Sequence, residues 1–132
     1  MGGDSLRIGV LTGGGDCPGL NPAIRAVVRR ADQYGHSVLG INNGWAGLLG
    51  EGATTPLGLR DVSGILTLGG TILGTSRTNP MKNPEHVKQV IDNFARHSID
   101  ALVAIGGDDT LSVAARLADM DLKVVGIPKT MD

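Results

Sequence analysis

The chain has 132 residues, of which 41% are hydrophobic and 19% are charged, and this balance suits one globular domain rather than a disordered segment. A formal net charge of −1 gives no electrostatic reason to expect nucleic-acid binding. The sequence has neither a secretory signal pattern nor an apolar run of about 18 residues, so we expect no membrane association. The single cysteine, Cys17, excludes an intramolecular disulfide, and we therefore expect a cytoplasmic protein.

Short apolar runs alternate with amphipathic patterns along the chain, which predicts an α/β fold with a parallel sheet flanked by helices. Aromatic residues make up only 2% of the chain, so the core is expected to consist of Val, Ile, Leu and Ala. Residues 43–80 are expected to be rich in loops, with a short helix over residues 61–66. Strands are predicted at Leu6 to Thr12, Ser37 to Asn42, Ile99 to Ile105 and Lys123 to Ile127.

Three helices are predicted from apolar residues spaced i, i+3, i+4, i+7, which form one buried stripe on each helix. The first helix is expected to have Asn21 as its N-cap and to end before Gly35. The second is expected to start at Pro84, and Asp108 or Asp109 is expected to cap the third. The stripes are Ile24, Val27, Val28 and Ala31; Val87, Val90, Ile91 and Phe94; and Leu111, Ala114, Ala115 and Ala118.

The loop from Thr12 to Asn21 leads a predicted strand into a predicted helix. Ligands of such sheets bind at the carboxyl ends of the strands, so chemistry is expected in loops of this kind. The loop is rich in glycine, but Leu20 replaces the lysine of a P-loop and Pro18 replaces the last glycine of a dinucleotide-binding turn. A phosphate-binding turn and a purely structural turn therefore both remain open.

The segment Gly106-Gly107-Asp108-Asp109-Thr110 lies between a predicted strand and a predicted helix. Its glycines allow the backbone to approach an anion, the helix start offers N–H groups, and a carboxylate can recruit Mg²⁺. The second acid, Asp109, would repel a polyphosphate unless a cation lay between them. The loop from Pro128 to Asp132 adds a cation, a hydroxyl group and a carboxylate, so the sequence predicts phosphate and metal chemistry.

Taken together, four motifs resemble those of the 6-phosphofructokinase family, most closely its pyrophosphate-dependent members. The motifs are IGVLTGGGDCPGLN at Ile8 to Asn21, GGTILGTSR at Gly69 to Arg77, IGGDDT at Ile105 to Thr110, and PKTMD at Pro128 to Asp132. The resemblance implies a Rossmann-like lobe over residues 1–132 that binds the phosphoryl donor. It also implies a glycolytic phosphotransferase that uses Mg²⁺ to transfer a phosphoryl group from pyrophosphate or ATP to the 1-hydroxyl of fructose 6-phosphate, giving fructose 1,6-bisphosphate.

The resemblance assigns the donor and metal contacts to particular residues. Gly14 and Gly15 would let backbone N–H groups hold the donor phosphates, and Arg77 would neutralise charge on the transferred group. Asp108 would hold Mg²⁺. Without the resemblance, Arg77 is better explained as a solvated loop residue. Asp108 could also cap a helix, and this role is compatible with holding Mg²⁺.

The last residues of the chain match the family's catalytic loop. Asp132 is implied to be the general base that takes the proton from the sugar hydroxyl, and Thr130 is implied to contact the substrate. Most of the sugar-phosphate site and the other lobe would lie outside this chain. We therefore expect an N-terminal portion of the enzyme that is inactive alone and forms homo-oligomers when full length.

The choice of donor is predicted from Asp109. The resemblance places Gly107, Asp109, Thr110 and Lys129 against the donor phosphates, with Lys129 also implied in catalysis. Glycine is common at the position of Asp109 in ATP-dependent relatives, and an aspartate there adds bulk and negative charge near the extra phosphate of ATP. Pyrophosphate is therefore the predicted donor. ATP is the alternative, because some family members depart from this glycine rule. Lysine at position 129 also occurs in some ATP-dependent relatives, so Lys129 alone decides little.

Two further interpretations remain open at this stage. The Gly-Gly-Asp turn followed by a helix also resembles that of NAD kinases. The loops at residues 13–21 and 69–77 favour a phosphofructokinase instead. A non-catalytic phosphate- or nucleotide-binding module is the other. The histidines lack ligand spacing, Cys17 lacks a basic partner for catalysis, and Trp45 is expected either beside the donor or in the core.

Overall fold

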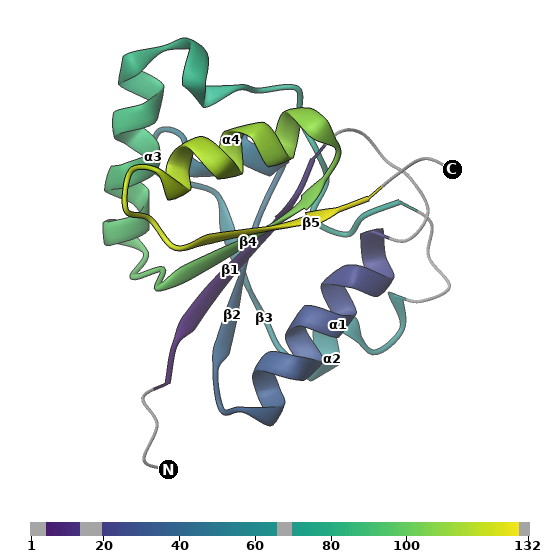
Figure 1. The fold of residues 1–132 in the computed structure, drawn as a ribbon. Helices are drawn as coiled ribbons and strands as arrows, with labels where there is room; N and C mark the ends of the chain where they lie inside the picture. Colours follow the sequence, from purple (N-terminus) through teal and green to yellow (C-terminus); the bar gives the residue numbers. More distant parts are fainter. Residues whose placement is uncertain (1–4, 14–19, 66–69, 130–132) are drawn as a thin grey trace.

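The computed structural model describes residues 5–13, 20–65 and 70–129, and these form an α/β fold with one five-stranded sheet (Figure 1). The strand order is β3-β2-β1-β4-β5, and neighbouring strands are parallel except β2 and β3, which are antiparallel. The strands are β1 (Arg7–Thr12), β2 (Ser37–Ile41), β3 (Thr54–Leu57), β4 (Ala101–Gly106) and β5 (Val124–Pro128). The predicted fold class and the four predicted strands are confirmed.

The strand β3 was not predicted. It has four residues, includes Pro56, and exposes Thr55 and Pro56 to solvent. A proline and a weak apolar pattern are typical of an edge strand, and β3 lies at one edge of the sheet. Its antiparallel pairing with β2 makes the sheet mostly, rather than wholly, parallel.

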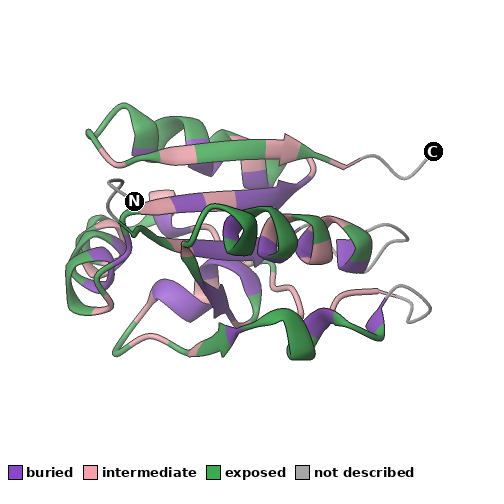
Figure 2. Cartoon of the chain, turned by 90° about the horizontal axis from the view of Figure 1, so that it is seen from below, coloured by how far each residue is buried: buried purple, intermediate pink, exposed green. Residues whose placement is uncertain are grey.

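Helices cover both faces of the sheet and divide the core into two clusters. The helices are α1 (Leu20–Gln33), α2 (Leu59–Val62), α3 (Pro84–Arg96) and α4 (Asp108–Ala118), with short 3₁₀ turns η1 (Gly44–Leu48) and η3 (Pro80–Lys82). Side chains of α3, α4 and η1 pack with Leu11, Leu102 and Ala104 on one face, while α1 and α2 pack with Val10 and Ile105 on the other. Buried residues concentrate in the central strands, and edge strand β5 is partly exposed (Figure 2).

Two predicted helix caps are wrong. Asn21 lies inside α1, where its buried side chain accepts a hydrogen bond from the Ile72 N–H at 2.7 Å. The N-cap of α4 is Gly107, and Asp108 and Asp109 occupy its first turn. In both cases the helix starts earlier than the sequence pattern predicts. The start of α3 at Pro84 is confirmed, whereas α2 begins two residues earlier than predicted and ends at Val62.

Among the described residues, no helix is both long and apolar enough to cross a membrane.

Candidate phosphate-binding site

The loops after β1, β4 and β5 meet at the end of the sheet where the carboxyl ends of these strands lie. The Gly13 N–H donates to the Ile105 carbonyl at 2.9 Å, which joins the end of β1 to the end of β4. The Lys129 N–H donates to the Gly106 carbonyl at 2.9 Å, which joins β5 to the same point. The sequence motifs that were predicted to act together are thus joined by backbone hydrogen bonds.

Two glycines allow this edge to pack closely. A Cβ atom added to Gly13 would overlap the Thr110 hydroxyl, and one added to Gly106 would lie 2.6 Å from the Gly13 carbonyl oxygen. Gly107 differs, because a Cβ there would meet no atom within 4 Å among the described residues. Gly13 and Gly106 are therefore needed for packing, whereas Gly107 borders open space at the start of α4.

The first turn of α4 combines amide donors with two carboxylates. The first helical hydrogen bond runs from the Leu111 N–H to the Gly107 carbonyl at 3.0 Å, so the preceding N–H groups have no partner within the helix. This helix end attracts anions through its amides and dipole. Asp108 and Asp109 are both exposed there, so a phosphate at this turn requires a neighbouring cation.

The segment before Arg77 is attached to β1 through Thr12, which is fully buried. The Thr12 hydroxyl donates to the Gly74 carbonyl at 2.9 Å. It lies 2.8 Å from the Thr71 hydroxyl, and because its own hydrogen is used, Thr71 is the donor. Asn21 accepts from Ile72 in the same segment. These contacts fix the backbone that leads to Arg77.

A cavity of about 620 Å³ lies between this segment and α4. It brings together three of the predicted residues, Arg77, Asp109 and Thr110. Asp108 is exposed beside it, at the start of α4, and does not belong to the lining. The cavity is lined by Trp45, Thr75, Ser76, Arg77, Thr78, Asn79, Lys82, Asp109, Thr110 and Val113.

Of the lining residues, Lys82 was not predicted, and Trp45 was expected either beside the donor or in the core. Lys82 adds a second cation to the cavity, and it lies in an exposed turn whose place is set by the tertiary fold. Trp45 is 3% exposed and belongs to the core cluster, which confirms the core interpretation; it also lines the cavity, and its place beside a donor stays a prediction. Trp45 Nε1 and Ser76 Oγ are buried and have no hydrogen-bond partner among the described residues.

Several predicted site residues lie outside the described part of the chain. These are Gly14, Gly15, Thr130 and Asp132. Within residues 5–13, 20–65 and 70–129, no group of three or more His, Cys, Asp and Glu side chains could hold a metal ion. Asp108 alone still suits Mg²⁺, because this ion is commonly held by one or two carboxylates together with phosphate oxygens and water.

Comparison with known proteins assigns the family. The phosphofructokinase family model matches residues 7–132. The chain belongs to the phosphofructokinase family. A pyrophosphate–fructose 6-phosphate 1-phosphotransferase from Dictyoglomus thermophilum is 58% identical over 127 residues, and ATP-dependent 6-phosphofructokinase 2 from Streptomyces coelicolor is 53% identical over 128 residues. These alignments cover 96% of this chain but only 36% and 37% of the two relatives.

The solved phosphofructokinase structure from Saccharomyces cerevisiae has the same fold over 96% of this chain. Its TM-score is 0.81 at 33% sequence identity, and the match covers 20% of that chain. The described part of the chain therefore has the fold of a phosphofructokinase.

Proposed function

We propose that this chain provides the donor site of an enzyme that transfers a phosphoryl group from pyrophosphate to fructose 6-phosphate. The observation that carries the proposal is the cavity in which Arg77, Lys82 and Asp109 lie beside the first turn of α4. A cavity with two cations, hydroxyl groups and a helix N-terminus is suited to a small, highly charged anion.

Phosphoryl transfer depends mainly on positioning and on neutralising charge, and the described residues supply both. Arg77 offers a planar set of N–H donors to the transferred group, and the contacts of Thr12 hold its segment in place. Trp45 and Ser76 carry buried polar atoms that a bound oxyanion could engage after a small adjustment of their side chains.

Mg²⁺ is part of the proposal. The exposed carboxylate of Asp108 would hold it together with donor oxygens, and the ion would neutralise charge on the donor. The proposal also includes Asp132 as the general base and Thr130 as a substrate contact. Gly14, Gly15 and Gly107 would bring backbone amides to the phosphates, and Lys129 would grip the end of the donor.

Asp109 supports pyrophosphate as the donor. Its side chain is exposed in the first turn of α4 and lines the same cavity as Arg77. ATP would place an additional phosphate and a nucleoside in this region. Two unit charges 4 Å apart repel by about 1 kcal/mol in water and about 4 kcal/mol at the effective dielectric constant of a protein surface. A carboxylate here therefore disfavours the longer donor by a measurable amount.

The test uses a full-length enzyme in which this chain replaces the matched 127 residues of the Dictyoglomus relative. We call this protein the grafted enzyme. Asp109→Gly should shift the ratio of kcat/KM for pyrophosphate to kcat/KM for ATP by about tenfold or more toward ATP, which corresponds to 1.4 kcal/mol. Asp109→Asn keeps the shape and removes the charge, so it separates the two effects. An unchanged ratio in both variants would refute this role of Asp109, and a grafted enzyme that prefers ATP before mutation would establish the alternative donor.

A further inference from the structure

Three polar side chains of α3 and its C-cap contact the loop that follows η1. Gln89, Asn93 and His97 are spaced four residues apart, so they lie on one side of the helix. The loop that they contact runs from Leu48, the last residue of η1, to Glu51. These hydrogen bonds join α3 to η1 in addition to the core cluster that the two elements share.

Asn93 lies at the centre of this contact and is fully buried. Its Nδ2 group donates to the Leu48 carbonyl at 2.7 Å and to the Gly50 carbonyl at 3.1 Å. Both amide hydrogens are thereby used, while Oδ1 has no hydrogen-bond partner among the described residues. The opposite orientation of the amide would place its oxygen against two carbonyl oxygens, so the contact depends on the donor group.

Two half-buried side chains flank Asn93 and contact the same loop. The Gly50 N–H donates to Gln89 Oε1 at 2.9 Å. His97 Nε2 lies 3.1 Å from the Glu51 carbonyl oxygen and donates to it, because a carbonyl oxygen only accepts. Four hydrogen bonds therefore fix the backbone of this loop to α3.

The other end of η1 is attached to the segment that leads to Arg77. The Asn43 N–H donates to the Leu73 carbonyl at 2.8 Å, and Gly44 begins the turn in a left-handed conformation with φ 61°. Trp45 follows directly, belongs to the core cluster shared with α3, and lines the cavity. The indole is therefore part of a turn that is fixed at both ends and forms part of the cavity wall.

We propose that Asn93 is a positioning residue of the donor site. Asn93 does not line the cavity, but it holds the end of η1 against α3 and thereby fixes Trp45 in the cavity wall. Without its two hydrogen bonds, the buried Leu48 carbonyl has lost its donor and η1 must move to find another. This role rests on the proposed function of the cavity as the donor site.

The experiment uses the grafted enzyme labelled with fluorotryptophan, in which the fluorine NMR signal of Trp45 is assigned by its loss in Trp45→Phe. Asn93→Leu keeps the branched shape of the side chain and removes the two donors. We expect the Trp45 signal of the ligand-free enzyme to shift in this variant. We also expect KM for pyrophosphate to rise about tenfold while kcat changes less than about twofold, because a wall residue contacts the donor before and during the reaction.

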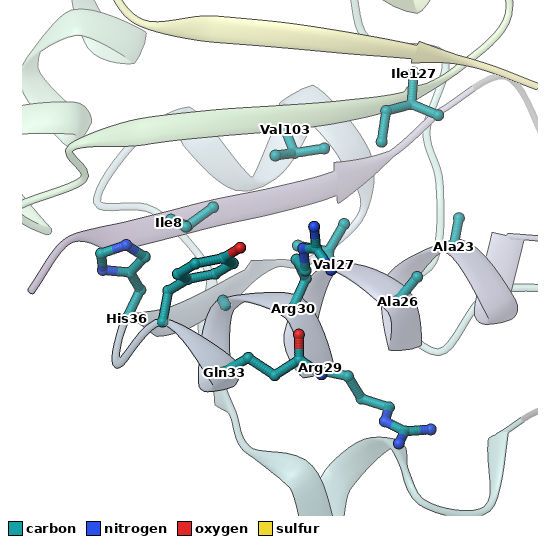
Figure 3. A pocket seen from close by; sticks show the side chains of 12 residues that line it. Ile8, Ala23, Ala26, Val27, Arg29, Arg30, Gln33, His36, Val103 and Ile127 are labelled. Carbon is teal, nitrogen blue, oxygen red and sulfur yellow. The ribbon is translucent and has the colours of Figure 1, made fainter.

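The matched control lies on the α1 side of the sheet, away from η1. Ile8, Val103 and Ile127 line an apolar groove of about 790 Å³ on that side, and none of the described residues lines both this groove and the donor cavity (Figure 3). Val28 of α1 is 2% exposed and belongs to the core cluster there. Val28→Ala should lower stability through the core but leave both the Trp45 signal and KM unchanged.

A Trp45 signal that moves no more in Asn93→Leu than in Val28→Ala would overturn the proposal, and so would a shifted signal with unchanged KM. The ligand-free signal requires no donor, so it tests the contact even if pyrophosphate is not used. An enzyme that prefers ATP is tested by its KM for ATP. The proposed donor and the proposed role of Asn93 can therefore fail separately.

A second pair of variants applies if Asn93→Leu does not fold. Gln89→Leu removes the acceptor of the Gly50 N–H, whereas Gln89→Glu keeps an acceptor at the same place. Only Gln89→Leu should shift the Trp45 signal and raise KM. Equal signals in the two variants would overturn the proposal.

Discussion

Substitution by alanine is predicted to affect stability differently at the two adjacent glycines Gly106 and Gly107. In Gly106→Ala, the new Cβ would lie 2.6 Å from the Gly13 carbonyl oxygen and 2.9 Å from the Thr110 hydroxyl. The first of these atoms belongs to the backbone, so relief requires β1 and β4 to separate. Overpacking of this kind costs about 1–3 kcal/mol. The loss of unfolded-state entropy offsets about 0.4–1 kcal/mol, so we expect a net loss of about 1 kcal/mol.

Gly107→Ala provides the matched control for stability. The added Cβ meets nothing within 4 Å, and the backbone of Gly107 is extended, with φ −90°. Its effect on unfolding should stay within about 0.5 kcal/mol. Pyrophosphate binding should nevertheless weaken by about tenfold, because the proposed donor approaches the backbone at this residue.

The assay combines urea unfolding followed by circular dichroism with calorimetry of pyrophosphate binding in the presence of Mg²⁺. Equal stability of the two variants would refute the packing argument for Gly106. Gly107→Ala that binds pyrophosphate as tightly as the parent chain would refute the placement of the donor beside this turn. The stability and binding measurements thus test separate parts of the argument.

Three other predictions follow from the same site. Thr12→Val should lower the free energy of unfolding by about 2 kcal/mol, because it leaves the Gly74 carbonyl without its donor. The control Thr55→Val, at an exposed position, should change this free energy by less than about 0.5 kcal/mol. Equal urea midpoints of the two variants would contradict this prediction. Arg77→Ala in the grafted enzyme should weaken pyrophosphate binding by at least about tenfold in calorimetry, while Arg60→Ala, exposed on α2, should not. The 132-residue chain alone should show negligible phosphorylation of fructose 6-phosphate in a coupled assay, and turnover comparable to that of a full-length relative would overturn that expectation.

The sequence predicts the sheet and the loops of the site because both depend on local patterns. Apolar runs identify four of the five strands, and glycine after β4 marks the turn into α4. The rule that ligands bind at the carboxyl ends of parallel strands then groups the loops correctly. Backbone hydrogen bonds from Gly13 and Lys129 to β4 confirm that grouping.

The surroundings of Arg77 depend on contacts between distant residues and were not predicted. Thr12 contacts the segment 59 and 62 residues further along the chain, and Asn21 accepts a hydrogen bond 51 residues away. In sequence, Asn21 before a helical stripe has the pattern of an N-cap, so the local signal conceals its long-range role. Lys82 was missed for a related reason, since only the tertiary fold brings its turn to the cavity.

The proposed choice of donor depends on one side chain rather than on overall similarity. The pyrophosphate-dependent Dictyoglomus relative is 58% identical and an ATP-dependent Streptomyces relative is 53% identical over almost the same length. Overall identity therefore differs little between these two relatives. Asp109 bears directly on the donor, because it places a negative charge in the cavity that contains Arg77. We therefore expect a change of about 1.4 kcal/mol at this position to alter the donor preference by about tenfold.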